Sequence, residues 1–106
     1  MDCIFCNIIN KEISSDIVYE DDNFIVFKDI NPAAPIHLLL APKVHISSVN
    51  DLKEKHKDLI GDLFLLAKKI AKEQKISHGY KLNFNVGRKG GQIVDHLHLH
   101  LLGGWK

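Results

Sequence analysis

The chain has 106 residues, which suits one domain, residues 1–106, with one hydrophobic core. Its formal net charge is +1, and its 14 lysine and arginine residues are spread along the chain, without the basic stripe of a nucleic-acid-binding protein. No apolar run approaches the roughly 20 residues that span a bilayer. Residues 1–6 are too polar for a signal peptide, and two cysteines are too few for a disulfide framework. We therefore expect a cytoplasmic protein without a nucleic-acid or membrane partner.

Three short apolar runs in the first half of the chain predict β-strands. Residues 17–19 and 24–27 flank a polar turn, which is the pattern of a β-hairpin. The segment 31–35 contains two prolines and breaks the chain. A third strand is expected at residues 37–41, and Pro42 should end it because proline has no backbone N–H to donate.

A change in the hydrophobic period predicts a long helix between Leu52 and Gln74. Apolar residues recur there three and four positions apart with charged residues between them, as in a helix that packs one face on a sheet. They are Leu59, Ile60, Leu63, Phe64, Leu66, Ala67, Ile70 and Ala71. Gly79 is a suitable stop after this helix.

Two more strands are expected after the helix. Residues 80–86 alternate between apolar and polar side chains, which is typical of a half-buried strand. A glycine-rich loop at 87–91 then leads to a last strand at about 93–102. Three strands, a helix and two strands predict an α+β fold, with a five-stranded antiparallel sheet and one long helix packed on it.

The strongest functional signal is the alternation of His96, His98 and His100 with leucines. Strand side chains alternate between faces, so the three imidazoles should share one face while the leucines are buried on the other. Protonated neighbours repel each other, so a purely structural use of this face is costly. The plain alternative is a strand whose histidines have no role, or core histidines bonded to the backbone.

Two chemical uses of the histidine face follow. Three imidazoles can bind a catalytic zinc ion, but strand residues four apart lie about 13 Å from each other, at ~3.3 Å per residue. One ion with bonds of about 2.1 Å cannot reach all three. A neutral imidazole, with an ordinary pKa near 6.5, is also a nitrogen nucleophile at cellular pH. The loop residues Gly90 and Gly91 can supply backbone N–H groups to a phosphoryl oxygen, so the pattern favours nucleophilic catalysis.

The pattern His-φ-His-φ-His-φ-φ at residues 96–102, with φ apolar, resembles the signature of the histidine-triad (HIT) family. Residues 3–6, 27–37 and 42–47 are also similar to segments of that family, so the resemblance covers essentially the whole chain. The ending at 102–104, Leu-Gly-Gly, resembles the Hint-like nucleotide-binding phosphoramidase branch. The dinucleoside polyphosphate hydrolase branch more often continues with Pro-Arg. The resemblance implies the HIT-like fold, with the sheet extended across a homodimer.

The resemblance also implies catalytic roles for three histidines. His98, in the middle of the triad, would be the nucleophile that forms a nucleotidyl-histidine intermediate. His100 would hydrogen-bond the phosphate. His37 would support the histidine cluster from the neighbouring strand.

The same resemblance implies a nucleotide-binding site. Asn85 and the backbone from Gly91 to Ile93 would bind the α-phosphate, and Asp29 would accept hydrogen bonds from the ribose hydroxyls. The base pocket would comprise Phe5, Ile8, Phe27, Ile30 and Leu39. Each apolar residue could equally belong to the core, and Asp29 could equally form a turn.

Three features depart from the family pattern. Ile93 stands where mammalian-type relatives place a hydroxyl that assists the leaving amine. Asp95 precedes the triad where an apolar or aromatic residue is more usual. The chain stops at Lys106, without the longer tail that approaches the partner subunit's site in Hint relatives. All three bear on substrate preference.

The two cysteines suggest a metal site. Cys3 and Cys6, at C-x₂-C spacing, form one half of a tetrahedral zinc site, and they lack the strand-and-helix context of a redox motif. In some bacterial HIT proteins the histidine of Pro-Lys-x-His and the first triad histidine complete such a site, which implies His45 and His96 here. A structural Cys₂His₂ zinc site would leave the other triad histidines for chemistry. Two buried thiols without a metal are the alternative.

The combined expectation is a homodimeric HIT hydrolase that acts on purine nucleoside 5′-phosphoramidates or related adenylates. Within enzymes, the alternative is a dinucleoside polyphosphate hydrolase. Outside enzymes, it is a nucleotide-binding or zinc-stabilised interaction module whose catalysis is vestigial. The presence of His98 and Asn85 favours the enzyme.

Overall fold

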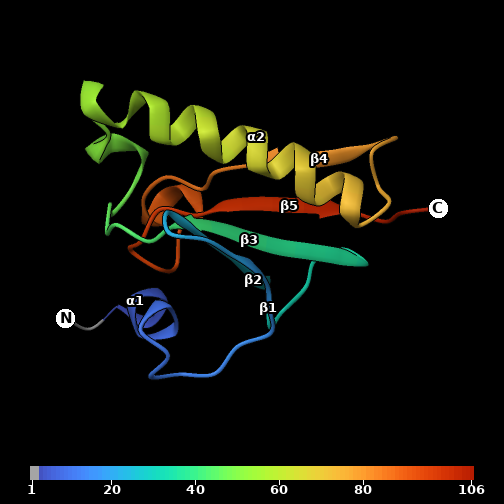
Figure 1. The fold of residues 1–106 in the computed structure, drawn as a ribbon, viewed down its shortest axis with the longest axis horizontal. Coiled ribbons are helices and arrows are strands. Elements are labelled where there is room, and N and C mark those ends of the chain that lie inside the picture. Colours follow the sequence, from blue (N-terminus) through green and yellow to red (C-terminus); the bar gives the residue numbers. More distant parts are fainter. Residues whose placement is uncertain (1–2) are drawn as a thin grey trace.

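The computed structural model describes residues 3–106, which form a five-stranded antiparallel sheet with two α-helices (Figure 1). The helices are α1 (Ile4–Ile9) and α2 (Lys57–Glu73), and the strands are β1 (Ile17–Glu20), β2 (Phe24–Lys28), β3 (Ile36–Pro42), β4 (Tyr80–Asn83) and β5 (Leu99–Gly103). The sheet order is β1-β2-β3-β5-β4. This confirms the predicted α+β fold, to which the short α1 is an addition. Within the described residues, neither helix is long and apolar enough to cross a membrane.

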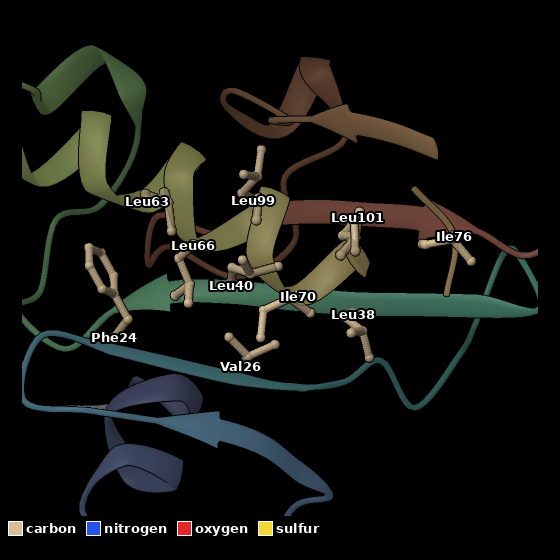
Figure 2. Close-up of a cluster of buried hydrophobic side chains, with 12 residues drawn as sticks. Phe24, Val26, Leu38, Leu40, Leu63, Leu66, Ile70, Ile76, Leu99 and Leu101 are labelled. Atoms are coloured by element: carbon tan, nitrogen blue, oxygen red, sulfur yellow. The ribbon is translucent and has the colours of Figure 1, made fainter. Parts of the chain in front are cut away.

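The larger core lies between α2 and one face of the sheet (Figure 2). Leu63, Leu66 and Ile70 of α2 pack there, and all three were expected on its apolar face. The sheet contributes alternate residues of three strands: Phe24, Val26, Leu38, Leu40, Leu99 and Leu101. The alternation confirms that the leucines of the histidine segment turn toward the core.

A second apolar cluster covers the opposite face of the sheet, beneath α1. It joins Phe5 and Ile8 of α1 to Ile25 and Phe27 of β2, together with Cys3, Leu39 and Ala41. Both faces of the central strands are therefore covered, which explains their continuous apolar sequences. The side chains of the triad lie on this second face, because the intervening leucines occupy the first.

The last strand is shorter than predicted. Strand β5 begins at Leu99, so the prediction of a strand from about residue 93 is wrong for its first half. Leu99 pairs with Leu40 of β3, and two residues later β3 ends at Pro42, which has no N–H to continue the pairing. The backbone before β5 is tied instead by Leu97 N–H, which donates to Ile46 O at 2.6 Å.

Two other boundaries differ from expectation, namely the start of the long helix and the end of the strand that follows it. A short 3₁₀ turn at Glu54–His56 replaces the first part of the expected helix, and another at Val49–Asp51 precedes it. The helix end expected at Gln74 is confirmed to within one residue, because Lys75 takes the left-handed conformation (φ 62°) and Ile76 N–H donates to Ala71 O at 3.0 Å. This Schellman arrangement ends α2 before Gly79 is reached. Strand β4 also ends early, because it pairs with β5 only as far as Asn83.

Candidate active site and metal centre

His98 is held as a neutral imidazole with one available nitrogen. Its side chain is buried, and Nδ1 lies 2.7 Å from the backbone oxygen of His96. A carbonyl oxygen only accepts hydrogen bonds, so Nδ1 carries the proton and Nε2 keeps its lone pair. Burial lowers the pKa of His98 below its usual value of 6.5, which keeps the ring neutral at pH 7. The ring therefore presents the unprotonated nitrogen that a nucleophile requires.

The tautomers of His37 and His100 are fixed by a chain of hydrogen bonds. Ala33 N–H donates to His37 Nδ1 at 3.0 Å, so the proton of neutral His37 resides on Nε2. His37 Nε2 lies 2.9 Å from His100 Nδ1 and donates to it. The proton of neutral His100 is then on Nε2.

His100 Nε2–H is an unsatisfied buried donor. Among residues 3–106 it has no hydrogen-bond partner, although such a group normally finds one. Burial, followed by the nearby His98 and His37, lowers the pKa of His100 to about 4, so the ring is neutral at pH 7. The ring centroids of His98 and His100 are 4.9 Å apart. The site thus places a nucleophilic nitrogen beside a vacant N–H donor, an arrangement suited to an anionic substrate.

The carboxylate of Asp29 makes two local contacts. Asn31 N–H donates to its Oδ1 at 2.8 Å, which is the turn-forming role that the sequence left open. Its Oδ2 lies 3.4 Å from His37 Nε2, so the carboxylate borders the histidine chain. A shallow cavity of about 320 Å³ beside it is lined by Asp29 and Ile30, together with Ser14, Ser15, Asp16 and Lys28.

The glycine-rich loop approaches Asn85 closely. Gly91 has φ 90°, and a Cβ atom there would lie 3.7 Å from Asn85 Nδ2, so the amide is next to the loop backbone. Buried Gln92 braces the loop, because its Nε2 donates to Ser47 O at 2.7 Å and its Oε1 accepts from Gly87 N–H at 2.9 Å. Ile93 is 84% exposed, and its side chain joins no core.

The unusual Asp95 has a partner in the same loop. Its two carboxylate oxygens accept from Arg88 Nη1 and Nη2 at 2.9 and 3.0 Å. Arg88 Nη1 also donates to Gln92 O at 2.6 Å. The ion pair between Arg88 and Asp95 is exposed, so it adds little stability. It nevertheless joins the two ends of the loop.

The two cysteines and two of the histidines form one cluster. The ligand atoms of Cys3, Cys6, His45 and His96 all lie within 4.8 Å of one another. Nδ1 of His96 is 3.4 Å from Cys3 Sγ and 3.5 Å from Cys6 Sγ. It is also 3.1 Å from Nδ1 of His45. Around a tetrahedral zinc ion, such atoms are separated by about 3.3–3.8 Å. The cluster therefore has nearly the dimensions of a Cys₂His₂ zinc site.

The protonation of the cluster also fits a metal. His96 Nε2–H donates to Pro42 O at 2.8 Å, which leaves Nδ1 unprotonated and directed at the sulfurs. Burial, and then Cys3, raise the pKa of the Cys6 thiol to about 11. A bound cation is what would hold both sulfurs as thiolates. The residues present therefore fit zinc.

A second cluster, Asp29, His37 and His100, has similar spacing but the wrong protonation for a metal. His37 Nδ1 already accepts from a backbone N–H, so the nitrogen that faces the cluster carries the proton. Binding a metal there would require an imidazolate. Among the described residues, the cluster that fits a metal therefore includes His96 and leaves out His98 and His100.

Comparison with known proteins agrees with this geometry. A protein-family model described as "Scavenger mRNA decapping enzyme C-term binding" matches residues 2–104. The purine nucleoside phosphoramidase of Escherichia coli K12 is 48% identical over 102 residues, which are 95% of this chain and 86% of the relative. The structure of a HIT family hydrolase from Legionella pneumophila has a TM-score of 0.97 at 46% identity, and the match covers 99% of this chain and 95% of that one. The chain belongs to the histidine-triad family.

One HIT relative is relevant to the cysteine cluster. A Brassica juncea protein named "14 kDa zinc-binding protein" is 44% identical, over 97% of this chain and 93% of its own. The name describes that protein, but it agrees with a cluster whose atoms fit zinc in this chain.

The residues expected in the HIT base pocket are only partly brought together. Phe5, Ile8, Phe27 and Leu39 are buried in the cluster beneath α1. Ile30 is 87% exposed and lies outside that cluster, although it borders the cavity beside Asp29.

Sequence reasoning missed the groups that set the histidine protons. The Ala33 N–H and the His96 carbonyl are backbone groups, so no residue type could have identified them. The Phe5 ring also packs against the His98 ring in a T-shaped arrangement, with centroids 4.9 Å apart and planes at 81°, although Phe5 was considered only for the base. Gln92, directly after the two glycines, was the one side chain whose position could have suggested its bracing role.

Proposed function

We propose that this HIT protein hydrolyses purine nucleoside 5′-phosphoramidates or related adenylates, with His98 as the nucleophile. The observation that carries the proposal is the 2.7 Å hydrogen bond from His98 Nδ1–H to the His96 carbonyl, which leaves Nε2 unprotonated. The Escherichia coli relative, named purine nucleoside phosphoramidase, supports this class of substrate.

Hydrolysis proceeds in two steps. The lone pair of His98 Nε2 bonds to the α-phosphorus while the P–N bond breaks, and the electron pair of that bond leaves with the amine. The amine takes up a proton from water, because the Ile93 side chain has no donor. Water then attacks the phosphorus of the nucleotidyl-histidine and loses a proton to solvent. The N–P electron pair returns to His98, which releases the nucleoside 5′-monophosphate.

The histidine chain stabilises the phosphate. His100 Nε2–H donates to a phosphate oxygen, which gives this buried donor the partner it otherwise lacks. His37 keeps the proton on that nitrogen, since it donates to His100 Nδ1 from the other side. Neutral His100 already has the N–H that this hydrogen bond requires, so binding the phosphate oxygen does not need a protonated, cationic His100.

The rest of the nucleotide contacts residues that surround the histidines. Asn85 and the backbone from Gly91 to Ile93 bind the α-phosphate, which the closeness of Asn85 to Gly91 supports. Asp29 accepts from the ribose hydroxyls beside the cavity that it lines. The base contacts the apolar residues Phe5, Ile8, Phe27 and Leu39, and exposed Ile30 covers it from the loop.

Substrate profiling tests the proposal. We expect kcat/KM for adenosine 5′-phosphoramidate to exceed that for a diadenosine polyphosphate by roughly tenfold or more. The measurement is release of AMP under matched conditions. The reverse ranking would make the chain a dinucleoside polyphosphate hydrolase, and AMP binding without turnover of either substrate would indicate a binding module.

We also propose that the cluster of Cys3, Cys6, His45 and His96 holds one structural zinc ion per chain. Its interatomic distances support this assignment. Thiolate ligands must stay reduced, which suits a cytoplasmic location. The α1 segment that carries both cysteines packs on the sheet, which supports a single domain over residues 1–106.

Homodimer formation is a further expectation. Strand β4 is an edge of the sheet, and nearby α2 exposes Phe64 and Leu65, which are 43% and 67% accessible. We propose that two copies join there, extending the sheet and covering these side chains. Sedimentation at micromolar concentration should show a dimer, and Leu65→Arg should shift it toward monomer.

The control for this experiment is Ile13→Arg, at an exposed isoleucine on a loop away from α2. It should leave the sedimentation of the dimer unchanged. A wild-type monomer would contradict the dimer, and a dimer that Leu65→Arg leaves intact would place the interface elsewhere.

A further inference from the structure

His96 takes part in both the metal cluster and the catalytic cluster. Its imidazole faces Cys3 and Cys6, whereas its backbone carbonyl accepts the hydrogen bond from His98 Nδ1–H. The side chain is fully buried and engaged through both ring nitrogens, because Nε2–H donates to Pro42 O. The position of the carbonyl therefore depends on the position of the ring.

One further backbone contact holds the chain around His96. Residues 96–98 lie before β5 and outside the sheet. Among the described residues, one backbone hydrogen bond joins this segment to the chain after β3: Leu97 N–H donates to Ile46 O. That N–H belongs to the same peptide unit as the His96 carbonyl, and Ile46 directly follows His45 in the chain. The carbonyl that sets the His98 tautomer is therefore held both by the His96 imidazole and by the segment that carries His45.

Phe5 forms a second connection between the two clusters. It lies between Cys3 and Cys6 in α1, and its ring centroid is 4.9 Å from that of His98 and 5.9 Å from that of His96. Helix α1 has six residues, too few to be stable alone. Cys3 Sγ also accepts from Cys6 N–H at 3.2 Å, so the same sulfur caps this helix. Whatever fixes the two sulfurs also fixes the ring against His98.

We propose that the metal-loaded Cys3–Cys6–His45–His96 cluster positions the nucleophile, with the His96 carbonyl and the Phe5 ring as the two positioning groups. The cluster would then act on the tautomer and orientation of His98 as well as on stability. The catalytic consequence rests on the proposed function, whereas the effect on the His98 ring does not.

Histidine ¹⁵N NMR at constant pH tests the effect on the ring. In the zinc-loaded protein, His98 should give the shifts of an Nδ1–H tautomer. In His45→Ala, which removes a metal ligand located away from α1 and β5, the two His98 nitrogens should move toward averaged shifts. His78→Ala, at an exposed histidine outside both clusters, is the matched control and should leave the His98 signals unchanged.

The same samples test catalysis. We expect His45→Ala to slow acid-quenched labelling of His98 by about 10–100-fold, the scale of losing support around a functional site. Folded His45→Ala protein that lacks zinc but has wild-type His98 shifts would overturn the proposal. No turnover in any sample, with the shift difference present, would refute the proposed function and leave this inference standing.

Phe5→Leu provides a readout that does not require metal loss. It should keep one zinc per chain and a folded spectrum, yet change the His98 ¹⁵N shifts. If His45→Ala unfolds, this variant decides the question. Unchanged His98 shifts in zinc-loaded Phe5→Leu would then overturn the proposal.

Discussion

We expect His98→Ala to lower kcat by several orders of magnitude, about 10³-fold or more, the scale of removing a catalytic nucleophile. The substitution removes the nitrogen that bonds to phosphorus, and no other described imidazole has an unprotonated nitrogen directed at the same place. His100 presents N–H there, because its Nδ1 accepts from His37. AMP binding should persist, since Asp29 and Asn85 are untouched. Steady-state kinetics and calorimetric titration with AMP measure the two effects.

Two further variants are compared with His98→Ala. His100→Ala should cause a smaller loss, because it removes a donor to the phosphate but keeps the nucleophile. His78→Ala, at an exposed histidine, should leave kcat unchanged.

Trapping the intermediate identifies the nucleophile directly. Rapid acid quench with labelled substrate should leave a nucleotide on wild-type protein and none on His98→Ala. Near-normal turnover by His98→Ala, or a label on another residue, would show that the mechanism is wrong even with this fold.

The second large effect is expected from metal removal. Elemental analysis of protein made without added metal should find about one zinc per chain, and chelation should lower the free energy of unfolding by several kcal/mol. The reason is that the cluster ties α1 to the chain after β3 and to the segment before β5, through Cys6, His45 and His96. Denaturant titration with and without chelator gives the difference.

Cys3→Ala separates metal loss from loss of the side chain. This variant should bind little zinc, and chelator should then have little further effect on its stability. If wild-type protein made without added metal contains no zinc, and Cys3→Ala has the same thermal stability as that protein, the site does not exist.

Local patterns in the sequence were sufficient for the elements that bury one clear face. The spacing of Leu63, Leu66 and Ile70 predicted the packed face of α2, and the leucines between the triad histidines predicted which side of that segment turns away from the imidazoles into the core. Both follow from fixed geometric periods, 3.6 residues in a helix and two in extended chain. The boundaries were less accurate, because they depend on partners: β5 starts where β3 can pair with it, and α2 begins at Lys57 rather than near Leu52.

The sequence by itself also determined which residue types form the chemistry, namely three alternating histidines and a C-x₂-C pair. Only the tertiary structure decided how those histidines divide. The His96 ring turns to the cysteines and donates to Pro42 O, whereas His100 hydrogen-bonds to His37, which lies 63 positions earlier in the chain. The protons follow from backbone groups such as the Ala33 N–H. Such groups occur in every residue, so their placement comes from the fold and not from residue identity.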